Sequence, residues 1–185
     1  MEKTQELNDI VAGCARGDRS CQHALYQRFY GRLMVICQRY TNNEDQAKDI
    51  LQEGFIKIFK HIKDFEQKGS FEGWVKRIVT NTAIDYYRKR SNDFLLMHEE
   101  DDIERTEWEE EEGDLEDVFG MTPNEVLKAV QKLSPSYQMV FNLYVVEDYS
   151  HKEIAEMLDI SVGTSKSNLA KAKQNLRAML KVSIK

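Results

Sequence analysis

A strongly acidic stretch in the second half of the chain restricts how the chain can fold. Residues 99–117 contain thirteen acidic side chains against Arg105 alone, a net charge of −12. Like charges at this density, with few apolar residues among them, do not support a packed core. We therefore predict a flexible acidic linker at residues 92–120, which joins two small folded domains at residues 1–91 and 121–185.

The acidic stretch also masks the charge of the two domains. The whole chain carries −6, but residues 1–98 and residues 118–185 each carry +3. Two mildly basic domains are compatible with binding to nucleic acid. The negative charge of the whole chain, taken alone, would argue against such binding. No apolar run approaches the roughly eighteen residues that span a bilayer, and the N-terminus lacks the apolar core of a signal peptide. We expect a cytoplasmic protein without membrane insertion.

Apolar side chains recur every three or four residues on both sides of the acidic stretch, as in helices with one buried face. No segment alternates apolar and polar residues like a half-buried strand, so the predicted fold class is all-α. The apolar faces expected in residues 1–91 are Leu7, Ile10, Val11 and Cys14; Cys21, Leu25, Phe29, Leu33, Ile36 and Tyr40; Ala47, Ile50, Leu51, Phe55, Ile58, Phe59 and Ile62; and Phe71, Trp74, Val75, Ile78, Thr82 and Tyr86. Those expected in residues 121–185 begin with Val126, Leu127, Val130 and Leu133, followed by Tyr137, Val140, Phe141, Tyr144 and Val145.

Capping motifs predict where several of these helices begin. In a capping box, a serine or threonine and a glutamate three residues later each bond the other's backbone N–H. The pattern occurs at Thr41 and Glu44, at Thr122 and Glu125, and at Ser150 and Glu153. The three cysteines lie near the N-terminus without a Cys-x-x-Cys spacing, so we interpret them as reduced thiols on apolar helical positions.

Residues 150–177 have the pattern of a helix-turn-helix. A short helix after Ser150 is followed by a break at residues 159–161 and by a second helix from Val162 or Gly163. The second helix has Ser165, Leu169, Ala172 and Leu176 on its inner face. Its outer side chains are predicted to bind DNA: Thr164, Lys166, Ser167, Asn168, Lys171 and Lys173. Asn168 is the strongest candidate for base recognition, because a carboxamide can pair with N6 and N7 of adenine together.

Two sequence blocks together resemble the extracytoplasmic-function sigma factors of bacterial RNA polymerase, which contain only sigma regions 2 and 4. The first block is DQAKDILQEGFIKIFKHIKDF at residues 45–65, followed by GSFEGWVKRIVTNTAIDYYRKR at residues 69–90. The second is LSPSYQMVFNLYVVEDYSHKEIAEMLDISVGTSKSNLAKAKQNLR at residues 133–177. The resemblance implies a promoter-specificity subunit that reads the −35 duplex with region 4, and melts and reads the −10 element with region 2. Its implied partners are core RNA polymerase, through the β′ clamp helices and the β flap, promoter DNA and an anti-sigma factor.

The resemblance also assigns roles within the first domain. The polymerase-binding residues would be Asp45, Asp49, Gln52, Glu53 and Ile56. The −10 DNA-binding residues would be Lys76, Arg77, Thr80, Asn81, Tyr87 and Arg88, whose cations and aromatic or amide groups suit an unstacked single strand. The loop from Glu66 to Ser70 would hold a flipped base. Trp74 could assist melting, although its place in the apolar face favours a core role.

The second helix of the helix-turn-helix departs from the usual family motif G-T-V-K-S-R-L-x-R-A-R. Asn168, Lys171 and Lys173 stand where that motif has arginines, and lysine lacks the two-pronged donor geometry of arginine. The resemblance therefore implies −35 binding with an altered base preference. Ser165 replaces the inward valine, so we expect this helix to be held less firmly than in its relatives.

Other functions remain open at this point. A stand-alone helix-turn-helix regulator would bind duplex DNA without polymerase, as a dimer on paired half-sites. A helical interaction protein would bind acidic partners and no DNA. We find no phosphate-binding loop, metal-ligand cluster or paired nucleophile and base, so we predict no enzymatic activity, no catalytic or metal-binding residues and no cofactor. The linker could be a simple tether, thread a cationic channel of polymerase, or shield the basic faces when polymerase is absent.

Overall fold

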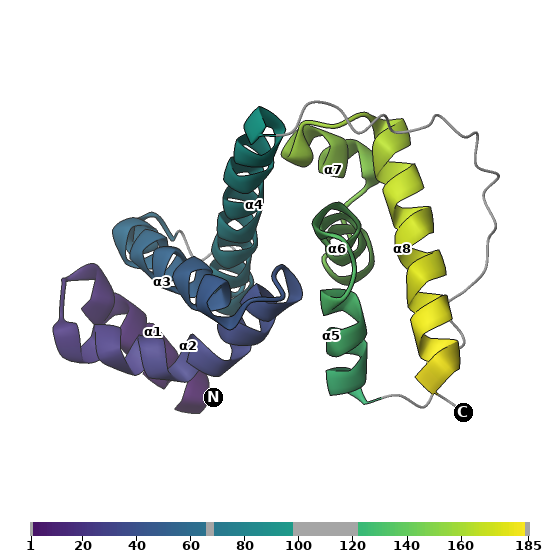
Figure 1. Ribbon diagram of the computed structural model, residues 1–185. Coiled ribbons are helices and arrows are strands. Elements are labelled where there is room, and N and C mark those ends of the chain that lie inside the picture. The colour runs from purple at the N-terminus through teal and green to yellow at the C-terminus, as the bar shows by residue number, and fades with distance from the viewer. Residues whose placement is uncertain (1, 66–68, 98–121, 184–185) are drawn as a thin grey trace. The chain divides into compact units, whose positions relative to one another are not determined.

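Every regular element that the structure describes is a helix. The computed structural model describes residues 2–65, 69–97 and 122–183 (Figure 1), and the all-α prediction is confirmed for these ranges. Contacts divide the chain into two compact units, residues 1–38 with 43–83, and residues 39–42 with 84–185. Most of the predicted linker, residues 98–120, lies outside the described residues.

The first unit is built from α1 (Glu2–Ala15), α2 (Arg19–Arg39), α3 (Glu44–His61), the 3-10 turn η1 (Ile62–Asp64) and the beginning of α4 (Phe71–Met97). Ion pairs join Arg28 to Glu6 at 3.1 Å and Arg32 to Glu72 at 3.0 Å, so α2 is linked to both α1 and α4. The core side chains come from α2, α3 and α4: Leu25, Phe29, Leu33, Ile36, Ala47, Ile50, Leu51, Phe55, Ile58, Phe71, Val75 and Val79. These residues reproduce most of the predicted apolar faces.

Gly54 allows α3 and α4 to approach each other closely. A Cβ atom at this position would lie 3.0 Å from Cγ2 of Val79, which is fully buried. This proximity fixes the crossing point of the two helices that carry the proposed functional residues of the first domain.

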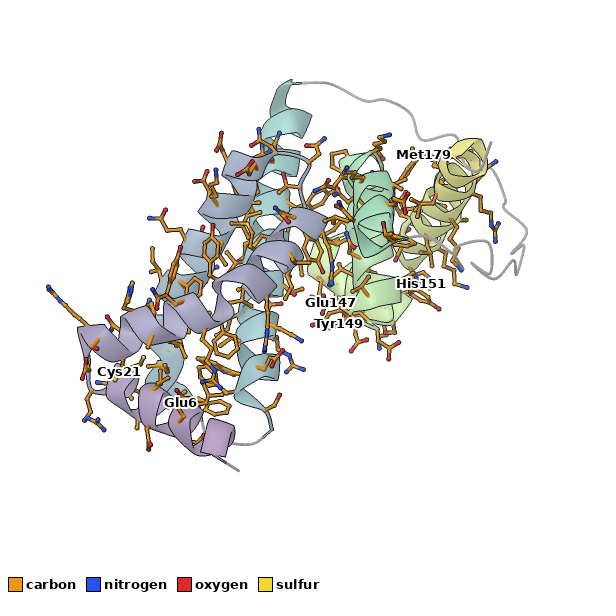
Figure 2. The ribbon with its side chains drawn as sticks, turned by 90° about the horizontal axis from the view of Figure 1, so that it is seen from below. Glu6, Cys21, Glu147, Tyr149, His151 and Met179 are labelled. Carbon is orange, nitrogen blue, oxygen red and sulfur yellow. The ribbon has the colours of Figure 1, made fainter. Side chains whose placement is uncertain are left out.

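The three cysteines are not joined in disulfides in the structure. Burial is the main cause that raises the pKa of the Cys14 thiol to about 11 and that of Cys37 to about 12. Cys21, on the α1–α2 hairpin (Figure 2), is half-buried. Because a thiol must lose its proton to become a strong nucleophile, these raised pKa values favour a structural role.

The second unit contains α5 (Pro123–Gln131), α6 (Pro135–Phe141), the π-helix η3 (Asn142–Val146), α7 (His151–Leu158) and α8 (Val162–Ser183). Helices α5, α6 and α7 all pack on α8, which runs along one side of the unit (Figure 1). Their buried side chains form a second core: Val130, Leu133, Met139, Val140, Phe141, Leu143, Ile154, Leu158, Leu169, Ala172 and Leu176. The capping boxes predicted at Thr122 and Ser150 are both present.

Three sequence expectations about helix boundaries and buried faces need correction. The box predicted at Thr41 is absent: α3 is capped by Asn43, whose side chain bonds the backbone N–H groups of Asp45 and Gln46, and asparagine caps as well as threonine. Tyr144 and Val145 are 38% and 42% exposed instead of facing the core. They lie in the π-helix, whose wider turn changes which side chains face inward.

The third correction concerns the end of the first domain. Helix α4 extends through Met97, so residues 92–97 are helical rather than part of the linker. The acidic residues that favoured a linker begin only at Glu99.

Candidate nucleic-acid interface

The helix-turn-helix is held in place by local hydrogen bonds. The Ser150–Glu153 capping box starts α7, and Asp159 ends it in the left-handed conformation, with φ 57° and ψ 47°. Ser161 then caps α8, because its Oγ accepts a hydrogen bond of 2.9 Å from the backbone N–H of Thr164. The first helix, the tight break and the start of the second helix therefore agree with the sequence prediction.

The side chains predicted to bind −35 DNA differ in their exposure and in the hydrogen bonds of their hydroxyl groups. Lys166 is exposed, whereas Asn168, Lys171 and Lys173 are half-buried. The Thr164 hydroxyl lies 2.8 Å from that of Ser161, and the Ser167 hydroxyl donates to the carbonyl of Thr164. Both hydroxyls thus help to stabilise the first turns of α8. The cationic lysines and the carboxamide of Asn168 are the groups whose chemistry suits phosphates and base edges.

Ser165 has a partner that sequence reasoning missed. Its side chain is fully buried, and its Oγ lies 2.9 Å from Nδ1 of His151 at the start of α7. The imidazole of His151 also stacks on Tyr144, with 4.4 Å between ring centroids and 22° between planes. The directional bond partly replaces the apolar packing that a valine would give. A polar residue on an inward position was the available signal, because such a group needs a buried partner.

Most of the residues of α4 that are predicted to bind the −10 element lie on its surface, but one does not. Lys76, Arg77, Asn81 and Arg88 are exposed, and Tyr87 is half-buried. Thr80 is only 1% exposed, and its hydroxyl has no hydrogen-bond partner among the described residues. Thr80 is therefore a core residue in this structure, and we remove it from the predicted DNA surface.

Trp74 belongs to an aromatic cluster beside the predicted base-flipping loop. Its ring centroid is 5.5 Å from that of Phe65 and 5.6 Å from that of Phe71. Phe65 precedes the loop and Phe71 follows it, so the cluster joins the two chain segments on either side. These contacts favour the core role of Trp74. Loop residues 66–68 lie outside the described part of the chain.

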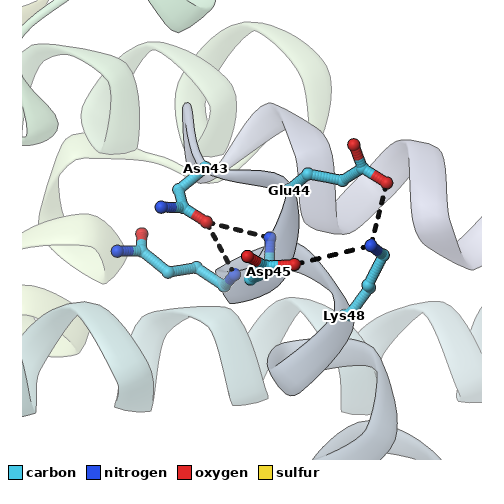
Figure 3. Close-up of polar contacts among 5 residues, drawn as sticks. Asn43, Glu44, Asp45 and Lys48 are labelled. Carbon is cyan, nitrogen blue, oxygen red and sulfur yellow. Dashed lines mark hydrogen bonds and ion pairs between the residues drawn. The ribbon is translucent and has the colours of Figure 1, made fainter.

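The predicted polymerase-binding residues form one polar stripe on α3. Asp45, Asp49, Gln52 and Ile56 are exposed and Glu53 is half-buried, on the side of the helix opposite its buried face. Ile56 is 60% exposed. Lys48 pairs with Glu44 at 2.9 Å and with Asp45 at 3.5 Å beside this stripe (Figure 3). The stripe thus combines carboxylates with one accessible apolar side chain.

Two further observations apply only to residues 2–65, 69–97 and 122–183. No three side chains of histidine, cysteine, aspartate or glutamate gather there in a way that could hold a metal ion. No helix in the same ranges is both long enough and apolar enough to cross a bilayer.

Two segments of the chain match models of sigma-70 regions. Residues 25–92 match the Sigma-70 region 2 family and residues 124–176 match the Sigma-70, region 4 family. The chain is 29% identical over 172 residues to the ECF RNA polymerase sigma factor SigW of Bacillus subtilis, covering 90% of this chain and 92% of SigW. It is 27% identical over 183 residues to the ECF sigma factor SigE of Mycolicibacterium smegmatis, covering 97% of this chain and 70% of SigE.

Among solved structures, one similar chain is the sigma factor RpoE of Bartonella quintana in complex with the anti-sigma factor NepR. The sequence identity is 21%, the TM-score is 0.48, and the match covers 86% of this chain and 98% of the other. The two matched sigma regions, their order and the near full-length relatives agree with the helix-turn-helix and the polar helices described above. The chain belongs to the extracytoplasmic-function sigma factors, with sigma region 2 followed by sigma region 4.

Proposed function

We propose that this sigma factor binds core RNA polymerase through α3, opens and reads the −10 element with α4, and reads the −35 duplex with α8. The observation that carries this proposal is the division of its polar surfaces. The exposed stripe of α3 is acidic with one isoleucine, whereas α4 and α8 present lysine, arginine and asparagine side chains. Acidic and cationic surfaces suit different partners, and only the cationic ones suit DNA phosphates.

The α3 stripe has the properties of a protein-docking surface. Asp45 and Glu53 are each paired with a lysine of the same helix, at 3.5 Å and 3.4 Å, while Ile56 offers exposed apolar area. Charged residues in such a stripe direct the orientation of a partner, and the apolar residue adds buried area. The proposed partner is the pair of β′ clamp helices. The β flap is the proposed partner of region 4.

The α4 surface suits a separated DNA strand. Arg77, Asn81 and Arg88 are spaced by four and seven residues and are all exposed, so they share one face of the helix. Guanidinium groups can bind phosphates and also stack on bases, and the Asn81 amide can pair with base edges. Lys76 contributes less free charge, because Glu72 pairs with it at 3.2 Å.

The α8 surface suits the major groove of duplex DNA. Lys166, Lys171 and Lys173 would contact phosphates and Asn168 a base edge, as in other recognition helices. We propose that region 2 extends to the end of α4 at Met97, that residues 98–120 are the connecting segment and that residues 121–185 are region 4. An anti-sigma factor, a cytoplasmic location and the lack of enzymatic activity are further parts of the proposal that derive from family membership.

Run-off transcription from a genomic library, with core polymerase in the presence and absence of the full chain, tests this proposal. We expect transcripts that need both proteins and whose templates share a pair of upstream elements. A lack of chain-dependent transcripts would overturn the proposal. Tight binding to paired half-sites without polymerase would instead indicate a stand-alone regulator.

A further inference from the structure

Ser165 is the one polar side chain in the inward row of α8 that otherwise contains Leu169, Ala172 and Leu176. It is completely buried, and it lies in the first turn of the helix, directly between Thr164 and Lys166. A hydroxyl in such a place costs free energy unless it is hydrogen-bonded. Its contact with His151 therefore offsets the cost of burying this hydroxyl.

The imidazole of His151 is held from several directions. Its Nδ1 lies 2.9 Å from Ser165 Oγ, and its ring is stacked on Tyr144. Its backbone begins α7 directly after Ser150, which is fixed by the capping box with Glu153. The position of His151, labelled in Figure 2, is thus set by α7 and by the preceding π-helix, independently of its contact with α8.

A hydrogen bond at this point constrains rotation of α8 about its own axis. Apolar contacts at Leu169 and Leu176 are not directional, and Leu176 lies about 16 Å further along the helix at 1.5 Å per residue. The Cα atoms lie about 2.3 Å from a helix axis and long side chains reach about 5–6 Å, so a serine Oγ lies roughly 4 Å from the axis. A rotation of roughly 15° therefore moves it by about 1 Å. A shift of this size exceeds the range of donor–acceptor distances in a good hydrogen bond.

We infer that His151 is a positioning residue for promoter recognition. Through its bond to Ser165, it sets the rotation of the first turns of α8 and hence where Asn168 and Lys166 meet the −35 element. The inference rests on the proposed function of α8 as the −35 reader. It assigns a role in base discrimination to a histidine that has no proposed contact with DNA.

The test compares two promoters that share one −10 element and differ only in the −35 element. Both are transcribed in one reaction by core polymerase with the full chain, and the ratio of their transcripts measures −35 discrimination. A variant that only unfolds lowers both transcripts and leaves the ratio unchanged. The variants are His151→Ala, Ser165→Ala, the double variant, Ser165→Val and His151→Asn, with exposed His23→Ala on α2 as the matched control.

We expect His151→Ala and Ser165→Ala each to lower the ratio by about three- to tenfold, the effect of losing roughly 0.7–1.4 kcal/mol of discrimination. The double variant should lose no more than the larger single loss, because both changes remove the same bond. Ser165→Val should lower the ratio without lowering the melting temperature, since valine packs well there. His151→Asn should largely restore the ratio, because its carboxamide can donate or accept near the position of Nδ1.

Additive losses in the double variant would overturn the inference, as would an unchanged ratio in Ser165→Val or in both alanine variants. A ratio near one for the parent chain has a different meaning. It would show that α8 does not read the −35 element and would overturn the proposed function together with the inference.

Discussion

Helices α3 and α8, whose surfaces are proposed to bind different partners, differ in the charge of their first turns. Helix α3 starts with Glu44 and Asp45, whose carboxylates lie at the positive end of the helix dipole. The first turn of α8, residues 162–165, contains no acidic residue. Helix α3 therefore neutralises its own N-terminus, whereas the N-terminus of α8 keeps its positive potential for an external anion such as a DNA phosphate.

The buried sides of the two helices differ in a related way. The inward face of α3 is entirely apolar apart from Gly54, while that of α8 includes Ser165 bonded to His151. Apolar packing holds a surface in place but tolerates small rotations. A directional bond restricts rotation, which a helix that recognises bases needs more than one that docks on protein.

An acidic residue introduced at the start of α8 should remove the electrostatic contrast. Thr164→Glu places a carboxylate in the first turn, where it should stabilise the isolated helix by about 0.3–1 kcal/mol. The same charge faces DNA phosphates, so −35-dependent transcription should fall by at least about tenfold. Thr164→Gln, which adds the same bulk without charge, is the control. Undiminished transcription with Thr164→Glu would show that this end of α8 does not face DNA.

Reversing the charge on α3 should separate polymerase binding from DNA recognition. Asp49→Lys in the exposed stripe should weaken binding of the full chain to core polymerase by about tenfold, because like charges would then meet at the interface. Asp9→Lys makes the same charge change on α1 and should have little effect. The measurement is a titration of core polymerase with labelled chain. Equal affinities for parent and Asp49→Lys would contradict the docking assignment.

Removal of the α7 cap should show how much the helix-turn-helix depends on local hydrogen bonds. Ser150→Ala should lower the free energy of unfolding by about 1 kcal/mol, the usual cost of losing a capping side chain. Ser134→Ala is a matched control, since Ser134 occupies the N-cap of α6 without a side-chain hydrogen bond. Denaturant unfolding of the full chain gives both values. Equal losses for the two variants would mean that the Ser150 cap contributes nothing specific.

Acid should weaken the same capping boxes, and we expect its effect on the free energy of unfolding to be smaller than the effects of the substitutions above. Hydrogen bonds from the Ser150 side chain and backbone lower the pKa of Glu153, and those from the backbone and side chain of Thr122 lower the pKa of Glu125. A lowered pKa means that the folded state favours the charged form. The contribution to stability is thus complete above the ordinary glutamate pKa and is lost as the pH falls through the lowered value.

Glu153→Gln should therefore make unfolding less sensitive to pH below about 4.5 than it is in the parent chain. Glu156→Gln, on an exposed position of the same helix, is the control. The measurement is the free energy of unfolding across the acid range. If the free energy of unfolding of Glu153→Gln falls with pH as steeply as that of the parent, the cap does not contribute to the acid sensitivity.

Features encoded within one helical segment could be predicted from the sequence. The apolar faces of α2 and α3 follow three- and four-residue periodicity, and the buried residues match it closely. The capping boxes at Thr122 and Ser150 depend on residues three apart, so they are visible in the sequence and present in the structure. The α3 stripe was also predictable, because an amphipathic helix fixes the outer face once the inner face is known.

Features that depend on contacts between segments could not be predicted. The bond between His151 and Ser165 joins residues fourteen apart in sequence on two different helices. The inward position of Ser165 indicates that it needs a buried partner, but nothing in α8 alone identifies that partner as His151. The burial of Thr80 depends on tertiary packing of α4 and not on its helical period. The exposure of Tyr144 and Val145 depends on a π-helix, for which the local sequence gave no signal.

Transcription from a promoter library in which both the −35 and −10 elements are randomised tests most directly whether α8 and α4 read different elements. The library is transcribed by core polymerase with the parent chain, with Asn168→Ala or with Arg77→Ala, and the templates that produce transcripts are sequenced. Asn168→Ala should change base preference within the −35 element and leave −10 preference unaltered, and Arg77→Ala should affect only the −10 element. A shift confined to the −10 element in Asn168→Ala would contradict the assignment of the two readers.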